Sequence, residues 1–211
     1  MTEMDRLAGT LLWLCETSSP TGGEGPLCDA IVARIADQPL ARPVRRYGNS
    51  IVVPVTRDTG GPRVALAGHL DVVPSSHDGP PRIDGDRLYG PGASDMKSGL
   101  ALMLELLERE PEICQGVDLT LVFYACEEGD FDDNELGVVL NEDPELSRVE
   151  LAVCLEPSDN KLSLGACGSL QAGLHFAGQA AHSARPWQGK NAIHEAGRFL
   201  AELADLEPKK V

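Results

Sequence analysis

The stretch "LAGHLDVVP", residues 66–74, decides the fold. Apolar residues lead directly into His69, and Asp71 follows two positions later. Short valine-rich runs of this kind are typical of buried β-strands, in which residues 69 and 71 would share a face. A neutral imidazole is a common metal ligand, and its second nitrogen usually donates to a carboxylate. We interpret His69 as a candidate ligand and Asp71 as its orienting partner; a surface histidine beside a capping aspartate is the alternative.

Strand and helix patterns alternate on both sides of this stretch. Because buried strands alternate with amphipathic helices, the sequence predicts an α/β fold with a mostly parallel sheet. One of the helices has Ser94 as its predicted N-cap. The predicted loop is 75–86, the predicted helices are 3–17, 26–37, 94–110, 134–142 and 189–206, and the predicted strands are 49–55, 62–68, 118–126, 149–157 and the half-exposed 169–179. The strands at 118–126 and 149–157 are expected to be fully buried.

Composition and charge argue against some classes of function. The chain has 211 residues, of which 42% are hydrophobic, and a formal net charge of −15. This charge argues against nonspecific nucleic-acid binding. No apolar run is long enough to cross a membrane, and the N-terminus lacks the features of a signal peptide, so we expect a cytoplasmic protein. The six cysteines form no C-x-x-C pair, which argues against a zinc ribbon.

Three further motifs place acidic residues where a predicted strand ends or a predicted helix begins. Asp95 lies in "GASDMKSG", Glu127 and Glu128 in "CEEGD", and Glu156 in "LEPSD". Each acid taken alone has a simpler interpretation, as a helix cap or a solvated loop residue. In an α/β fold, however, ligands bind at the carboxyl ends of the strands, so together with His69 these acids predict a metal site.

The four motifs occur in the order and spacing of a known family. The sequence resembles the dinuclear zinc aminoacylase and carboxypeptidase family over nearly its whole length. The segment "GACGSLQAGLHFAGQAAHSARPWQGKNAIH", residues 165–194, is most similar to the succinyl-diaminopimelate desuccinylases of that family, particularly the actinobacterial type. The resemblance implies a three-layer catalytic domain, followed by a small α+β lid and dimerisation domain.

The resemblance also implies roles for individual residues. Two zinc ions, with cobalt or manganese as alternatives, would share Asp95 as a bridging ligand, and a cis peptide bond would follow that residue. Glu127 would be the general base. His69 and Glu156 would bind the first zinc, Glu128 would bind the second, and Asp71 would orient His69. His182 would donate to the oxyanion, and Arg185 would contact a substrate carboxylate.

The implied reaction is metal-assisted hydrolysis of an amide. The expected substrate is a small anionic N-acyl amino acid, N-succinyl-LL-2,6-diaminopimelate, which would yield succinate and LL-diaminopimelate in lysine and diaminopimelate biosynthesis. The expected assembly is a homodimer formed through the lid domain, with no nucleic-acid or membrane partner. Two alternatives stay open: another deacylase or dipeptidase of the same family, such as an acetylornithine deacetylase, and a non-catalytic zinc-binding remnant.

The end of the chain departs from the family pattern. We expect the N-terminal part of the catalytic domain at 1–166 and an incomplete lid domain at 167–211. The last histidine ligand of the second zinc has no counterpart in the sequence. The sequence therefore predicts a truncated chain with an incomplete second metal site and weak activity.

Overall fold

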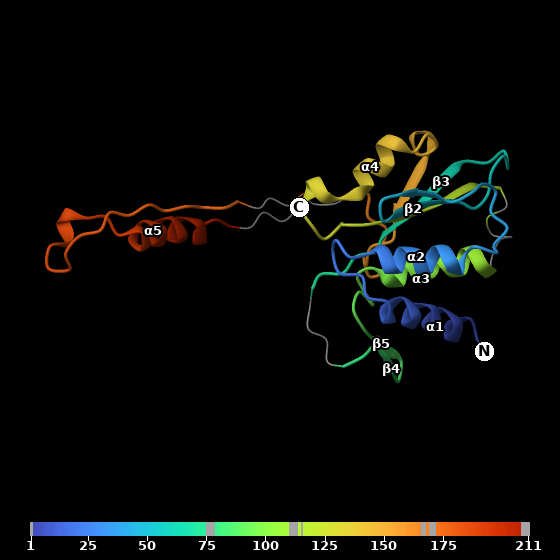
Figure 1. The fold of residues 1–211 in the computed structure, drawn as a ribbon, viewed down its shortest axis with the longest axis horizontal. Helices are drawn as coiled ribbons and strands as arrows, with labels where there is room; N and C mark the ends of the chain where they lie inside the picture. Colours follow the sequence, from blue (N-terminus) through green and yellow to red (C-terminus); the bar gives the residue numbers. More distant parts are fainter. Residues whose placement is uncertain are drawn as a thin grey trace. The chain divides into compact units, whose positions relative to one another are not determined.

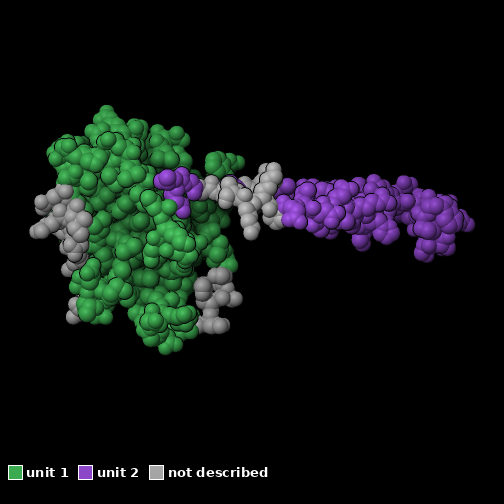
Figure 2. Space-filling model, turned by 180° about the vertical axis from the view of Figure 1, so that it is seen from behind, with its two compact units in different colours: residues 1–162 green, residues 163–211 purple. Residues whose placement is uncertain are grey.

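The computed structural model describes residues 2–74, 79–109, 114, 116–165, 168 and 172–207. It divides into two compact units, residues 1–162 and residues 163–211 (Figure 2). The first carries all the predicted metal ligands, and the second carries His182 and Arg185. Each unit is described by itself.

A five-stranded mixed sheet forms the centre of the first unit (Figure 1). Its order is β1-β2-β6-β3-β7, with β1 at Arg45–Tyr47, β2 at Ser50–Pro54, β3 at Arg63–His69, β6 at Asp118–Tyr124 and β7 at Leu151–Cys154. Strand β3 pairs in parallel with both β6 and β7, whereas β2 runs antiparallel to its neighbours β1 and β6. Four of the five strands therefore run in one direction, which confirms the predicted α/β class with a mostly parallel sheet.

Helices cover both faces of this sheet. Helices α1 (Glu3–Glu16), α2 (Gly25–Arg34) and α3 (Lys97–Arg109) lie on one side, and α4 (Glu135–Glu142) lies on the other (Figure 1). The described residues also form three short 3₁₀ turns: η1 (Phe131–Asp133), η2 (Leu146–Arg148) and, in the second unit, η3 (Pro186–Gln188). The first unit thus has the three layers implied by the family resemblance.

Alternation along the inner strands explains the two core layers. In β6, Leu121 and Phe123 pack with α1, α2 and α3, whereas Val122 and Tyr124 pack on the other face with Val139 of α4. Successive strand residues point to opposite faces, so a fully apolar strand can fill both layers. Because β6 and β3 are covered on both sides, their ends are fixed positions from which functional side chains can project.

Helix α3 is anchored close to the sheet and to α1. An added Cβ at Gly68 of β3 would lie 2.7 Å from side-chain atoms of both Leu100 and Met96, so a larger residue there would require these side chains to shift. The fully buried Lys97 donates from Nζ to the carbonyl oxygens of Leu14 and Thr17, at 3.0 Å each, where α1 ends. These contacts fix the start of α3. The two residues just before it, Asp95 and Met96, are joined by a cis peptide bond, as the resemblance implies.

Several sequence predictions about local structure were wrong. Helix α3 begins at Lys97, so Ser94 does not occupy its N-cap position. The stretch predicted as a loop contains β4 (Arg82–Asp84), which forms a hairpin with β5 (Arg87–Tyr89) through a two-residue turn with Gly85 at φ +63°. Strands of three residues are too short to give a readable pattern. Residues 75–78 of the same stretch lie outside the described part of the chain.

Strand β7 is exposed, although the sequence predicts a buried strand. Leu151 has 56% of its surface exposed, and Cys154 is also exposed. β7 is last in the sheet order, with β3 as its single neighbour among the described strands, and three of its four residues are exposed. An apolar sequence predicts a strand but does not say whether a covering layer is present.

Helix α5 (Ala192–Ala204) forms in the second unit, as predicted. Asn191 is its N-cap, and its side-chain oxygen accepts the backbone N–H of Ile193 at 2.9 Å. The strand predicted at 169–179 does not form within the described residues 172–178, and Gln179 makes only an isolated bridge with Lys190. Residues 169–171 lie outside the described part. Alternating polarity fixes the faces of a strand, but a strand also needs a neighbour for its backbone hydrogen bonds.

Two further features concern the cysteines and the apolar character of the helices. None of the five cysteines that the structure describes forms a disulfide bond, and Cys167 lies outside the described residues. No helix in the described parts of the chain is both long enough and apolar enough to span a membrane.

Candidate metal centre

His69 is the last residue of β3 and projects from the carboxyl end of the sheet. It is almost fully buried, and its Nδ1 lies 2.9 Å from the backbone oxygen of Asp71 and 3.4 Å from Oδ1 of the same residue. Its Nε2 lies 3.2 Å from Asp95 Oδ1 and 3.9 Å from Glu156 Oε1. One ring nitrogen is thus held by the Asp71 segment, while the other faces carboxylates and is free to bind a metal.

Asp71 has a second role that the sequence did not predict. The side chain is fully buried, and its two carboxylate oxygens accept the backbone N–H groups of Glu127 and Glu128, at 3.0 Å each. Burial opposes ionisation of this carboxyl, but the hydrogen bonds from His69 and from these two N–H groups outweigh it and lower the pKa of Asp71. Asp71 therefore stays charged and links β3 to the chain that follows β6.

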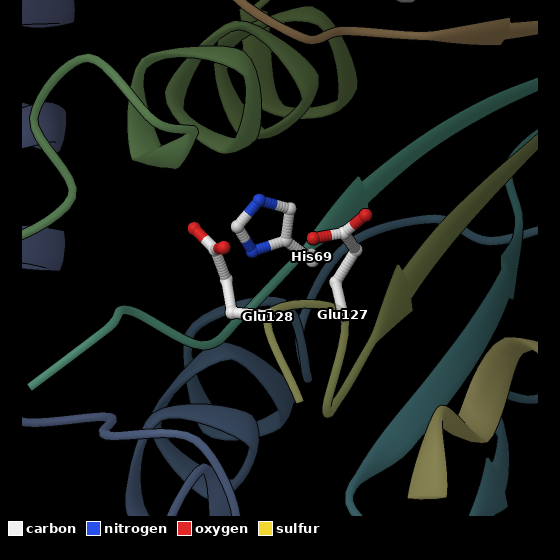
Figure 3. Close-up of side chains that lie close together, drawn as sticks. All are labelled: His69, Glu127 and Glu128. Atoms are coloured by element: carbon white, nitrogen blue, oxygen red, sulfur yellow. The ribbon is translucent and has the colours of Figure 1, made fainter. Parts of the chain in front are cut away.

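The four remaining acids come from three segments around the same imidazole. Glu127 and Glu128 follow β6 and lie on either side of the ring (Figure 3). Asp95 precedes α3, and Glu156 follows β7. Two groups of side chains could each hold a metal ion. One is His69 with Asp95 and Glu156, and the other is His69 with Glu127 and Glu128. Within each group the candidate ligand atoms lie within 4.8 Å of one another. The sequence placed all five of these residues at strand or helix ends, and the fold brings them together.

The electrostatics of the cluster favour a bound cation. Burial raises the pKa of Glu156 to about 7; His69 opposes this rise and the Asp95 carboxylate adds to it. Burial and the charge of Asp95 also raise the pKa of Glu128. Burial lowers the pKa of His69, but the hydrogen bond to Asp71 and the charge of Glu156 outweigh it and raise the pKa to about 9.

Carboxylates crowded together in this way disfavour their own ionised forms. A divalent cation among them would relieve that repulsion, and nitrogen and oxygen donors are ligands that zinc and similar ions accept. The residues present therefore fit a metal centre.

His182 and Arg185 belong to the second unit, whereas the cluster belongs to the first. Both are exposed; Nδ1 of His182 accepts the N–H of Ala184 at 3.1 Å, and the backbone N–H of Arg185 donates to the carbonyl of His182 at 2.8 Å. Their roles as oxyanion donor and substrate contact stay predictions.

Two residues that contact the cluster's backbone were missed at the sequence level. Glu24 and Ser50 accept backbone N–H groups of the chain that enters Glu127. Glu24 lies in "SPTGGEG", and an acid in a glycine-rich loop is usually solvated. The only signal was its position two residues before the predicted helix 26–37.

Fold and cluster together define an α/β protein with a candidate metal centre at the carboxyl ends of its parallel strands. The chain belongs to peptidase family M20/M25/M40, which it matches over residues 65–201.

Relatives of known name support this assignment. A relative from Mycobacterium tuberculosis is 38% identical over 198 residues, which are 94% of this chain and 55% of the relative. A Corynebacterium glutamicum protein named succinyl-diaminopimelate desuccinylase is 35% identical over 202 residues. The match covers 94% of this chain and 54% of the length of that protein. The chain thus spans about half the length of these relatives.

Solved structures show the same fold. A Staphylococcus aureus tripeptidase superimposes with a TM-score of 0.67 at 21% identity, over 95% of this chain and 57% of its own. An M20 family metallo-carboxypeptidase from Sulfolobus solfataricus gives a TM-score of 0.60 at 16% identity, over 74% of this chain and 37% of its own.

Proposed function

We propose that this chain carries the metal-binding catalytic part of an amide hydrolase that cleaves N-succinyl-LL-2,6-diaminopimelate to succinate and LL-diaminopimelate. The observation that carries the proposal is the convergence of one imidazole and four carboxylates on a single strand-end site. Membership of the M20/M25/M40 family supports hydrolysis. The name of the Corynebacterium glutamicum relative supports the substrate.

The metal ligands would be divided between two ions. His69, Asp95 and Glu156 would hold the first ion, and Asp95 and Glu128 would contribute to the second. When bound, such ions polarise the scissile carbonyl and lower the pKa of water to about 7. Asp71 keeps the imidazole of His69 oriented, with Nε2 directed toward the carboxylates. Zinc is the proposed metal, and cobalt or manganese would suit the same donors.

Glu127 is the proposed general base. Its carboxylate would take a proton from the attacking water and return it to the nitrogen of the leaving amine. The backbone N–H of Glu127 is held by Asp71, so its side chain starts from a fixed position beside His69. His182 would donate a hydrogen bond to the developing oxyanion, and Arg185 would bind a substrate carboxylate through its planar fork. These two roles, and a homodimer formed through the second unit, rest on the motif "AHSARP".

One experiment tests the function directly. Bound zinc is measured by elemental analysis after dialysis of the 211-residue protein, and hydrolysis is assayed on N-succinyl-diaminopimelate, N-acetylornithine and a dipeptide. Tight zinc binding with preferential release of succinate is the expected result. Preference for acetylornithine or for the dipeptide would reassign the substrate within the family. Zinc binding without turnover of any substrate would indicate a non-catalytic metal-binding chain.

A further inference from the structure

Four consecutive backbone N–H groups are held by side chains where β6 ends. They belong to residues 125–128, which we call the acid turn because it delivers Glu127 and Glu128. The N–H of Ala125 donates to Ser50 Oγ at 3.0 Å, and that of Cys126 donates to Glu24 Oε1 at 3.2 Å. The next two donate to the Asp71 carboxylate. Side chains from three distant segments thus replace the sheet's hydrogen bonds where the strand pairing stops.

The geometry of the acid turn requires such support. Cys126 has φ +59°, in the left-handed region that residues with a side chain rarely adopt. A backbone in this region persists when its surroundings hold it. The two glutamates that follow Cys126 lie on either side of His69 (Figure 3). The hydrogen bond from Cys126 to Glu24 therefore acts on the residue with the positive φ, directly before Glu127.

Glu24 is an unusual residue for this position. It is fully buried, and its hydrogen-bond donors are the N–H of Gly22 at 2.7 Å, the N–H and, at 3.5 Å, the Sγ of Cys126, and Asn49 Nδ2 at 3.5 Å. No lysine, arginine or histidine in the described residues forms an ion pair with it. A buried carboxylate is costly unless hydrogen bonds and dipoles compensate for it, and Glu24 lies directly before the N-terminus of α2, where a negative charge is favoured. Packing alone would be better served by an apolar side chain.

We propose that Glu24 is a positioning residue for the acid turn: through the N–H of Cys126 it holds the turn in the conformation that places Glu127 and Glu128 beside His69. The catalytic consequence rests on the proposed function, in which these two glutamates are the general base and a metal ligand. Glu24 itself contacts neither substrate nor metal in this scheme.

Three substitutions separate geometry from charge. Glu24→Ala removes the acceptor, and Glu24→Asp keeps the charge but withdraws the carboxylate by one methylene. Glu24→Gln keeps an acceptor oxygen in place without the charge. Asp143→Asn is the matched control, because Asp143 is also a buried carboxylate that accepts two backbone N–H groups, those of Glu145 at 2.9 Å and Leu146 at 3.3 Å. It lies outside the acid turn and the ligand cluster.

Two measurements read out the role of Glu24. The first is hydrogen exchange at the amides of residues 126–128 in the metal-free protein, and the second is the zinc affinity in competition with a chromophoric chelator. We expect Glu24→Ala and Glu24→Asp to accelerate exchange about tenfold or more and to weaken zinc binding by about 10–100-fold, the usual effect of losing an outer partner of a metal site. Glu24→Gln should stay close to the wild type. Where hydrolysis is measurable, kcat should fall more than KM rises.

The outcomes decide the proposal even where a variant is unstable. If Glu24→Ala does not fold, the contrast between Glu24→Asp and Glu24→Gln replaces it. Wild-type exchange and zinc affinity in Glu24→Asp would overturn the proposal, and so would an equal loss of zinc affinity in Asp143→Asn. If the wild type itself binds no metal, the proposed function fails, whereas the exchange comparison still tests Glu24.

Discussion

Glu127 and Glu128 are adjacent in the sequence, but Glu127 is the proposed general base and Glu128 a proposed metal ligand. Glu127→Gln should lower kcat by about 10²–10⁴-fold and leave zinc affinity nearly unchanged, because an amide cannot accept and return a proton. Glu128→Gln is the matched variant and should weaken zinc binding, because the proposed ligand loses its charge. Steady-state kinetics and chelator competition on both variants test this division. Equal effects of the two substitutions on zinc affinity would contradict it.

Asp143 provides a test of how stability depends on pH. Burial opposes its ionisation, but paired hydrogen bonds from Arg45 at 2.6 and 3.1 Å and the N–H of Glu145 outweigh it and lower the pKa below its ordinary value of 3.8. A carboxyl whose pKa is lower in the folded state contributes stability above its unfolded pKa, and loses it as the pH falls through the folded value.

We therefore expect Asp143→Asn to destabilise the protein by about 1–3 kcal/mol at neutral pH, with the difference from the wild type shrinking below about pH 4. Urea unfolding at pH 7 and at pH 3 measures it. A difference that is the same at both pH values would show that the charge of Asp143 is not the cause.

At the level of single residues, the sequence identified the candidate metal ligands but not the residues that hold them in place. His69, Asp95 and Glu156 could be predicted because each follows a strand pattern or precedes a helix pattern, and such ends meet at one edge of an α/β sheet. Glu24 could not be predicted, because its partner Cys126 is 102 positions away and no local pattern links them.

At the level of elements, the approach of α3 to the loop after β7 fixes the position of Glu156. A Cβ added at Gly99 of α3 would lie 2.7 Å from the backbone oxygen of Leu155, a contact that requires the backbone to shift. Gly99→Ala should therefore cost about 1–3 kcal/mol of stability and also weaken zinc binding, because the neighbouring Glu156 moves with Leu155.

Gly9→Ala in α1 is the control for this prediction. Gly9 is exposed within a helix and has no atom within 4 Å of its added Cβ, so alanine there should stabilise the protein by about 0.5–1 kcal/mol. Thermal unfolding and zinc competition compare the two variants. Stabilisation by Gly99→Ala would show that the helix and the loop move apart freely.

The elements that the sequence predicted correctly are those whose pattern is complete within one segment. Strand β6 is a continuous apolar run and is fully buried, and helices α1 and α3 each carry an apolar face that packs into the core. The failures involve neighbours: β7 lacks a second strand beside it, and residues 172–178 lack a strand partner in the described chain. Periodicity specifies the faces of an element but not what lies against them.

At the level of the whole molecule, the net charge is −15, and the metal centre of the first unit gathers four of the acidic side chains in one place. Four carboxylates around one imidazole are tolerated in the folded state at a cost, which a bound cation would offset. Unfolding disperses these groups into water, where their repulsion is screened. The folded unit should therefore bind a divalent cation much more tightly than the unfolded chain does.

Zinc should consequently raise the thermal stability of the protein. An ion that binds only the folded state stabilises it by about 2.7 kcal/mol when its free concentration is a hundred times the Kd. We expect Tm to rise with added zinc and to return on chelation. In His69→Ala most of the rise should be lost, because His69 belongs to both candidate ligand groups and is the proposed nitrogen ligand of the first ion.

His194→Ala is the matched control, since His194 lies on α5 in the second unit, outside both ligand groups. It should keep the full zinc-dependent rise. A rise that survives in His69→Ala would place the metal elsewhere on the acidic surface. Loss of the rise in His69→Ala but not in His194→Ala would locate metal-linked stability at the carboxyl end of β3, where the strand Arg63–His69 ends in the imidazole.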